Sequence, residues 1–186
     1  MNVTCFEEKN MGFLSKLFGR KESVTQSDVV QTGVPKENPA YAPKTRIAYK
    51  SDLIAKLIDD HRKLVALYTD IGKAFTADDL AGTVHRLRHF RSNIQEHLLT
   101  EKIQLYVYLQ YLLADDQLAY DLMRGLHREM DGIGKAVLAF LEKYDDLDNN
   151  CALLETFPTE FKAVGAVLVD RISREERTLY PLYMPA

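Results

Sequence analysis

Five side chains that can bind a metal ion interrupt the apolar patterns of this chain. They are His61, His97, Glu101, His127 and Glu175. Because His97 and Glu101 are four residues apart, a helix would place the imidazole and the carboxylate one turn apart on the same face. Imidazole nitrogen and carboxylate oxygen atoms are common ligands of iron, manganese and zinc. The pattern therefore predicts a metal site, provided that the fold brings these residues together.

The five residues lie on segments with helical periodicity. Apolar residues recur every three or four positions in about 51–74, 83–113, 117–144 and 152–180. Ser51 is suited to cap the first helix, and Pro158 is expected to interrupt or kink the last one. No segment alternates as a strand does. We therefore predict an all-α fold, an up-down-up-down antiparallel four-helix bundle.

Each predicted apolar face has an ionisable residue near its middle. These are His61 on the first helix, His97 and Glu101 on the second, His127 on the third, and Arg171 and Glu175 on the fourth. Such residues cost several kcal/mol if they are buried alone, so they should meet one another or a metal ion. One histidine on an apolar face is usually a core residue, but three on three helices are harder to explain by packing. His85 and His89 lie off these faces and are expected to face solvent.

The residues before the bundle have a different composition. Ser, Thr, Gln, Pro and Gly dominate from Glu22 to Lys44, which predicts that residues 1–47 form a flexible, disordered arm and linker. Within the arm, residues 11–21 are amphipathic and basic. This short segment is suited to weak contact with a membrane surface, or it is a frayed tail without such a role.

Composition and motifs exclude several other functions. The net charge of −3 at pH 7 gives no support for nucleic-acid binding, and no apolar run is long enough to span a bilayer. Cys5 and Cys151 form neither a disulfide framework nor a zinc-binding spacing, which favours a reducing, cytoplasmic compartment. The chain has no nucleophile and base pair, phosphate loop or nucleotide motif, so we do not predict an enzyme.

The helices that carry the candidate ligands resemble those of hemerythrin-like, HHE cation-binding domains. The resemblance covers about Ser51 to Tyr183 and is most specific at His97-x-x-x-Glu101 and at the ending Glu175-Glu-x-x-Leu-Tyr-Pro181. It implies that residues 48–186 surround a non-haem di-iron centre. Glu101 and Glu175 would then bridge two iron ions, and His61, His97 and His127 would be terminal ligands. It also implies binding or sensing of dioxygen, nitric oxide or peroxide, or a role in iron handling.

Arg171 departs from this family pattern, which has a histidine four residues before the last glutamate. A guanidinium group has no lone pair for a metal, although it can neutralise two carboxylates. Three outcomes are open: Arg171 turns away and leaves a five-ligand di-iron site, one iron is lost, or the site holds no metal.

The alternative function is that of a metal-free interaction bundle. The Arg171-x-x-x-Glu175-Glu176 pattern and residues 64–72 are similar to the regulator of sigma D family of bacterial anti-sigma factors. In such a protein Arg171 would replace the metal. The ligand spacing of His97 and Glu101 and the Leu-Tyr-Pro ending favour the metal-binding function.

Overall fold

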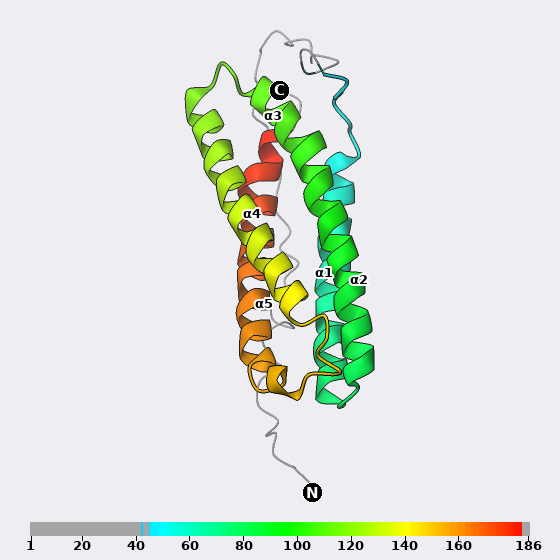
Figure 1. The fold of residues 1–186 in the computed structure, drawn as a ribbon. Coiled ribbons are helices and arrows are strands. Elements are labelled where there is room, and N and C mark those ends of the chain that lie inside the picture. Colours follow the sequence, from blue (N-terminus) through cyan, green and yellow to red (C-terminus); the bar gives the residue numbers. More distant parts are fainter. Residues whose placement is uncertain (1–41, 43–44, 184–186) are drawn as a thin grey trace, which may run out of the picture. The chain divides into compact units, whose positions relative to one another are not determined.

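The computed structural model describes residue 42 and residues 45–183, and all regular structure in this part of the chain is helical (Figure 1). The first helix is α1 (Leu53–Thr76). The second rod consists of α2 (Leu80–Thr100), the π-helix η2 (Glu101–Tyr106) and α3 (Val107–Leu112). The third is α4 (Gln117–Lys143), and the fourth consists of α5 (Phe157–Arg174), the π-helix η4 (Glu175–Leu179) and the 3₁₀ turn η5 (Tyr180–Tyr183). The prediction of an all-α fold is confirmed.

The helix boundaries correct two predictions. The N-cap of α1 is Asp52 rather than Ser51, and its side chain makes no capping bond. The last long helix begins at Phe157 rather than near residue 152, after the 3₁₀ turn η3 (Cys151–Leu153). Pro158 lies in the first turn of α5, where its missing N–H costs nothing, so it starts the helix instead of interrupting it.

Side-chain caps fix the starts of the two middle rods. The Asp79 carboxylate accepts a hydrogen bond from the Gly82 N–H at 2.8 Å, and the Asp116 carboxylate accepts one from the Ala119 N–H at 3.0 Å. Each bond satisfies a donor that the first turn of a helix leaves free. Asp78, between α1 and α2, has a φ of 59°, which aspartate tolerates better than most residues.

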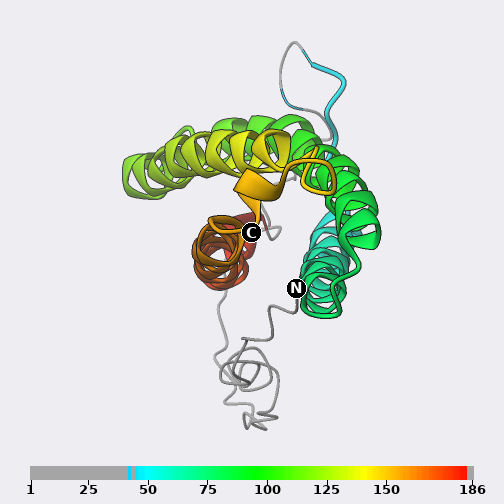
Figure 2. The ribbon, with the colours of Figure 1, turned by 60° about the horizontal axis from the view of Figure 1, so that its bottom comes forward.

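The rods contact one another in a ring. α1 packs against α2 and α5, and α4 packs against the same two neighbours. The views in Figures 1 and 2 agree that α1 and α2 lie side by side. Among the described residues, no helix is long and apolar enough to cross a membrane. Residues 11–21, which the sequence suggested for contact with a membrane surface, lie outside the described residues.

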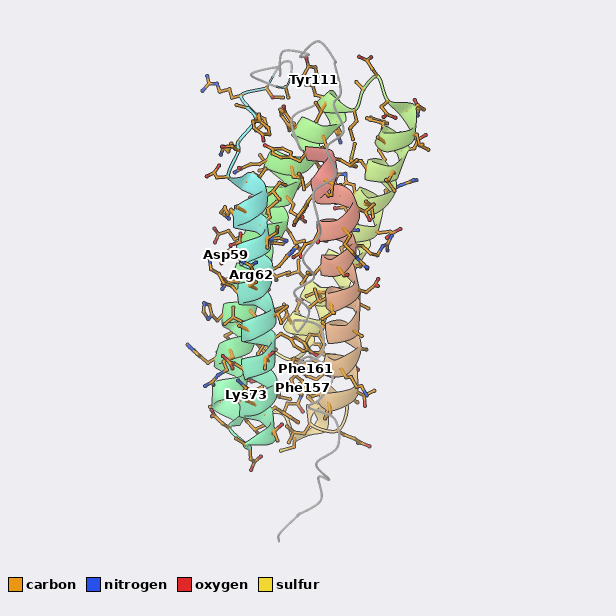
Figure 3. All side chains as sticks on the ribbon, turned by 180° about the vertical axis from the view of Figure 1, so that it is seen from behind. Asp59, Arg62, Lys73, Tyr111, Phe157 and Phe161 are labelled. Atoms are coloured by element: carbon orange, nitrogen blue, oxygen red, sulfur yellow. The ribbon has the colours of Figure 1, made fainter. Side chains whose placement is uncertain are left out.

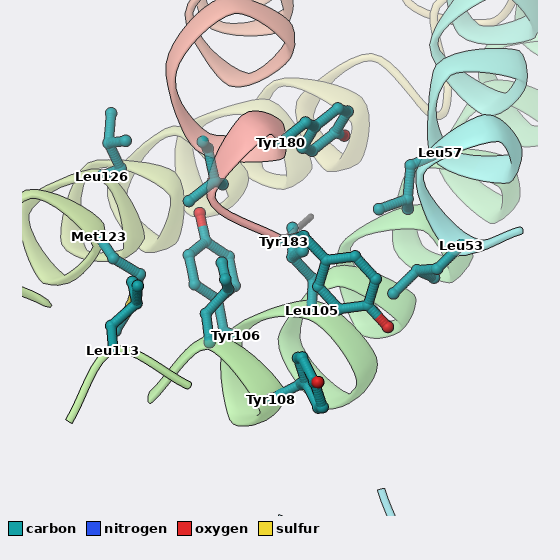
Figure 4. Packing of buried hydrophobic residues seen from close by; sticks show 12 residues of the cluster. Leu53, Leu57, Leu105, Tyr106, Tyr108, Leu113, Met123, Leu126, Tyr180 and Tyr183 are labelled. Carbon is teal, nitrogen blue, oxygen red and sulfur yellow. The ribbon is translucent and has the colours of Figure 1, made fainter. Parts of the chain in front are cut away.

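Two apolar clusters fill the bundle, one on each side of the level of His61. The first contains Leu53, Leu57, Leu105, Leu109 and Leu179 among others, and Figure 4 shows Tyr106 and Tyr180 within it. The second contains residues from the opposite ends of the same rods, including Leu64, Ile71, Val84, Ile94 and Phe157. Figure 3 shows Phe157 and Phe161 facing the interior, whereas Asp59 and Arg62 lie on the outer face of α1. His61 and the buried ionisable residues at its level therefore lie between two apolar layers.

Gly165 permits a close approach of Tyr68 on α1 to α5. The Tyr68 hydroxyl donates a hydrogen bond to the Phe161 carbonyl at 2.6 Å, and a Cβ atom at Gly165 would overlap the Tyr68 hydroxyl and ring. We therefore expect Gly165→Ala to destabilise the protein by about 1–3 kcal/mol, measured by denaturant unfolding. Gly132→Ala is the matched control, because the added methyl would have no atom within 4 Å apart from its chain neighbours and its own helix backbone. It should stabilise the protein by about 1 kcal/mol, and equal effects of the two changes would contradict this packing.

Candidate metal centre

Four buried side chains from three rods meet between the two apolar clusters. His61 comes from α1, His97 from the last turn of α2, Glu101 from the start of η2 and Glu175 from the start of η4. One potential ligand atom of each lies within 4.8 Å of the other three. All four residues are 2% exposed or less. Four of the five predicted ligands are therefore brought together.

The distances within this group suit a single ion. His61 Nε2 lies 3.2 Å from His97 Nε2 and 3.3 Å from Glu175 Oε2. His97 Nε2 lies 3.7 Å from Glu101 Oε2. Ligand atoms bound about 2.1 Å from one ion are about 3.0–3.4 Å apart in octahedral or tetrahedral geometry. Small side-chain movements would thus be enough to bind one cation.

The two carboxylates are each held by one oxygen. Glu101 Oε1 accepts a hydrogen bond from the Tyr180 hydroxyl at 2.9 Å, and Glu175 Oε1 accepts one from Arg171 Nε at 2.8 Å. The Oε2 atom of each glutamate is buried without a hydrogen-bond partner among the described residues. Unpaired buried oxygen atoms are costly, so these two favour a cation between them. The donor set fits one metal ion.

Arg171 lies inside the centre rather than turning away to solvent. Arg171 is 2% exposed, and its Nη2 donates a hydrogen bond to the Tyr106 hydroxyl at 2.9 Å. Because Nε is bonded to Glu175, the guanidinium connects that carboxylate to Tyr106. A second metal ion on this side of Glu175 would meet a positive charge instead of a lone pair. The residues present do not fit a second ion.

His127 lies outside the group of four, beside Tyr106. Its ring stacks on Tyr106, with the ring centroids 4.2 Å apart and an interplanar angle of 19°. The residue is half-buried, and its Nε2 is buried without a partner within the described part of the chain. The structure therefore separates His127 from the other four predicted ligands. His85 and His89 are exposed, as expected.

Glu176 is a residue of the site that the helical pattern did not reveal. Its carboxylate lies 2.9 Å from His61 Nδ1, and its side chain is 36% exposed. A carboxylate bonded to one ring nitrogen fixes the orientation of the imidazole and leaves the other nitrogen free to bind a metal. Glu176 therefore directs His61 Nε2 toward the centre.

Tyr106 and Tyr180 were also missed, because both depend on π-helical turns. In an α-helix, the residue five positions after a core residue points away from the core. The wider π-helix, which begins at Glu101 and again at Glu175, keeps positions four and five on the buried face. Leu105 and Tyr106 are accordingly both buried, as are Leu179 and Tyr180. The sequence does contain a signal, since Glu-x-x-x-Leu-Tyr occurs at both places.

Burial and neighbouring charges shift the pKa values of the centre. Burial, followed by the nearby His61, lowers the pKa of His97 from 6.5 to about 4. Burial and the Glu175 charge raise the pKa of Glu101 well above its usual value. Burial and the Glu101 charge raise the pKa of Tyr180. Burial alone would lower the pKa of Arg171, but Glu175 and Tyr106 raise it, so the guanidinium stays charged. A neutral His97 keeps the lone pair of one ring nitrogen available for a metal ion.

A pocket of about 190 Å³ between α1 and α2 leads toward His97. Its lining is mostly charged or polar and consists of Lys56, Asp60, Lys63, Leu64, Asn93, Glu96 and His97. Because His97 contributes to both the pocket and the group of four, a small molecule could approach the centre here.

Comparison with known families agrees with this geometry. The family model for the hemerythrin HHE cation binding domain matches residues 52–183. The chain belongs to the hemerythrin family. No curated protein and no solved structure gave a significant match. The matched range of this hemerythrin-family chain contains all four grouped residues, and the family supports cation binding at the His and Glu cluster.

The lowered pKa of His97 predicts a pH dependence in the metal-free protein. Unfolding restores a pKa of 6.5 from about 4, so the unfolded state binds more protons between these values. As the pH is lowered through this window, His97 should therefore cost the protein roughly 3 kcal/mol of stability, which is read as the difference between the unaltered protein and His97→Gln because the raised pKa of Glu101 acts in the opposite direction. Denaturant unfolding in the presence of a chelator measures the effect, which His97→Gln should largely remove. His89→Gln, at an exposed position, should retain it, and an equal loss in both variants would contradict the burial of His97.

Proposed function

We propose that this hemerythrin-family protein binds one iron ion at His61, His97, Glu101 and Glu175, and that Arg171 replaces a second ion. The observation that carries the proposal is the arrangement around Glu175. Its Oε1 is bonded to the Arg171 guanidinium at 2.8 Å, while its unpartnered Oε2 lies 3.3 Å from His61 Nε2. One carboxylate thus faces a fixed cation on one side and a set of metal ligands on the other.

Charge balance supports one ion rather than two. With a metal ion bound, Glu101 and Glu175 would both be ionised and supply two negative charges, and Arg171 supplies one positive charge permanently. A second metal ion would add at least two further positive charges in an apolar interior, where uncompensated charge is costly. Ligands are also few on that side of Glu175, where His127 would be the only other nitrogen donor of the predicted set.

The proposed activity is binding or sensing of a small molecule such as dioxygen, nitric oxide or peroxide, or a role in iron handling. Bound iron would supply a redox-active, Lewis-acidic position at which such a molecule can coordinate. The protein groups set its surroundings: Glu176 orients His61, and the pocket beside His97 gives access. Leu64 and Ile94, both buried, limit the approach of water. We infer no enzyme activity.

Other features of the proposal rest on the sequence. We infer that the four rods alternate in direction as an antiparallel bundle, that residues 1–47 form a separate arm, and that the protein acts in the cytoplasm.

A metal-free interaction protein similar to an anti-sigma factor is the second candidate. The observation that favours it is the buried ion pair of Arg171 and Glu175, which exists without a metal. Against it, the Oε2 atoms of Glu101 and Glu175 both lack hydrogen-bond partners in the described region. A bundle that needed only Arg171 would not require two imidazoles beside these oxygens.

Iron content tests the proposal. Anaerobic reconstitution with ferrous iron should give about one tightly bound iron per chain, measured by elemental analysis after desalting. His97→Ala should abolish tight binding, because it removes a ligand nitrogen. His127→Asn should leave the content unchanged, because His127 lies outside the group of four. Two irons in the unaltered protein would contradict the replacement of an ion by Arg171.

Restoring the family histidine should open the second position. Arg171→His exchanges a fixed positive charge for a nitrogen donor, so iron content should rise from about one toward two per chain. In the Arg171→His background, His127→Asn should return it to about one, because the second ion would then need His127. If Arg171→His left iron content unchanged, the assumed role of Arg171 would be wrong.

Thermal stability separates the two candidate functions. If iron binds the folded state, its removal by a chelator should lower the melting temperature, because binding free energy is linked to folding. Differential scanning calorimetry with and without added ferrous iron measures the shift, and His97→Ala should abolish it. Identical melting of the unaltered protein in both conditions would favour the metal-free function, which binding to a sigma factor would then test.

A further inference from the structure

The centre consists of two halves that contain corresponding residues. In the first half, His97, Glu101 and Tyr106 follow one another at intervals of four and five residues, and Arg171, Glu175 and Tyr180 have the same intervals in the second. A π-helix begins at the glutamate of each set. The two tyrosines therefore enter the centre by the same structural device.

Each tyrosine crosses to the opposite half. The Tyr106 ring stacks on His127 and its hydroxyl accepts a hydrogen bond from Arg171 at 2.9 Å. The Tyr180 ring lies nearly parallel to that of His61, with centroids 5.6 Å apart and an interplanar angle of 12°. The Tyr180 oxygen lies 3.2 Å from His61 Nε2 and 2.9 Å from Glu101 Oε1. The Tyr106 oxygen thus directly contacts the one fixed cation of the centre, the Arg171 guanidinium.

We propose that Tyr180 is a further ligand of the metal ion, which its phenolate oxygen binds beside His61, His97, Glu101 and Glu175. The inference rests on the proposed function, since it requires that an ion binds there. The Tyr180 oxygen would then contact the metal ion in the same way as the Tyr106 oxygen contacts the Arg171 guanidinium. Binding breaks the O–H bond and forms a metal–oxygen bond, and the proton is released to water.

The distances around Tyr180 agree with a shared coordination sphere. Neighbouring ligands of one octahedral ion, each about 2.1 Å from it, are separated by about 3.0 Å. The Tyr180 oxygen has such separations from one ligand nitrogen and from one ligand carboxylate. The residue is 2% exposed, so its ring is held in place by the surrounding apolar cluster.

Charge balance gives an independent reason and selects the oxidised ion. A ferric ion together with Arg171 carries four positive charges, whereas Glu101 and Glu175 supply only two negative charges. A phenolate at Tyr180 supplies a third, and Glu176, bonded to His61, supplies a fourth at the edge of the centre. The centre would then be neutral. A ferrous ion needs one charge fewer, so the phenolate should favour ferric iron.

The test uses the full-length protein loaded with iron and oxidised to the ferric state. Visible spectroscopy should show a phenolate-to-iron(III) charge-transfer band, and resonance Raman excitation in this band should give the ring vibrations of a tyrosinate ligand. Tyr180→Phe should lose both signals and bind ferric iron about tenfold more weakly or worse, with a smaller change for ferrous iron. Circular dichroism should show that Tyr180→Phe remains folded, since only the hydroxyl is lost.

Two matched controls identify the tyrosine. Tyr108→Phe removes a buried hydroxyl that has no partner among the described residues, and it should retain the band. Tyr106→Phe removes the corresponding hydroxyl beside Arg171 and should also retain it. A band that survives in Tyr180→Phe would overturn the proposal, because Tyr180 would then only orient Glu101.

The resonance Raman spectrum and iron content of the unaltered protein test the proposal even if Tyr180→Phe does not fold. Bound ferric iron with no tyrosinate vibrations would overturn the role of Tyr180 and leave the iron centre intact. Failure to bind any iron would instead overturn the proposed function. The two failures are therefore distinguishable in one set of samples.

Discussion

Two carboxylates buried at one level of a helical bundle are the constraint on which the rest of the centre depends. Glu101 and Glu175 cannot both be ionised in an apolar interior without positive charge or hydrogen bonds around them. Each has one oxygen held by a neighbour and one without a partner among the described residues. Arg171 compensates one of them, and the two imidazoles beside the free oxygens complete a site for one cation.

The sequence predicted what helical periodicity and ligand chemistry can reveal. The apolar positions of α1, from Leu53 to Ile71, and the burial of His61, His97, Glu101 and Glu175 agree with the prediction. Helix starts were less accurate, because a proline reads as a break as easily as a first turn, and Pro158 is in a first turn. His127 also fitted the α-helical pattern, but Leu126 is the buried residue there and the imidazole lies at the edge.

Tyr106 and Tyr180 could not be found from α-helical spacing, since the π-helices change which residues face the core. A residue five positions after Glu101 or Glu175 points outward in a regular α-helix and inward here. The contacts of Arg171 were likewise beyond the sequence, which left open whether this side chain turns away. Position 171 is where this chain departs from the ligand pattern of its family, and burial of the arginine there gives the centre one fixed cation.

Anomalous diffraction at the iron absorption edge, from crystals of the iron-loaded protein, would locate the bound iron and give the number of ions per chain. We expect one anomalous peak per chain, within bonding distance of His61, His97, Glu101 and Glu175, with Arg171 still bonded to Glu175. Two peaks that share Glu101 and Glu175, with Arg171 displaced, would contradict the binding of a single ion beside Arg171.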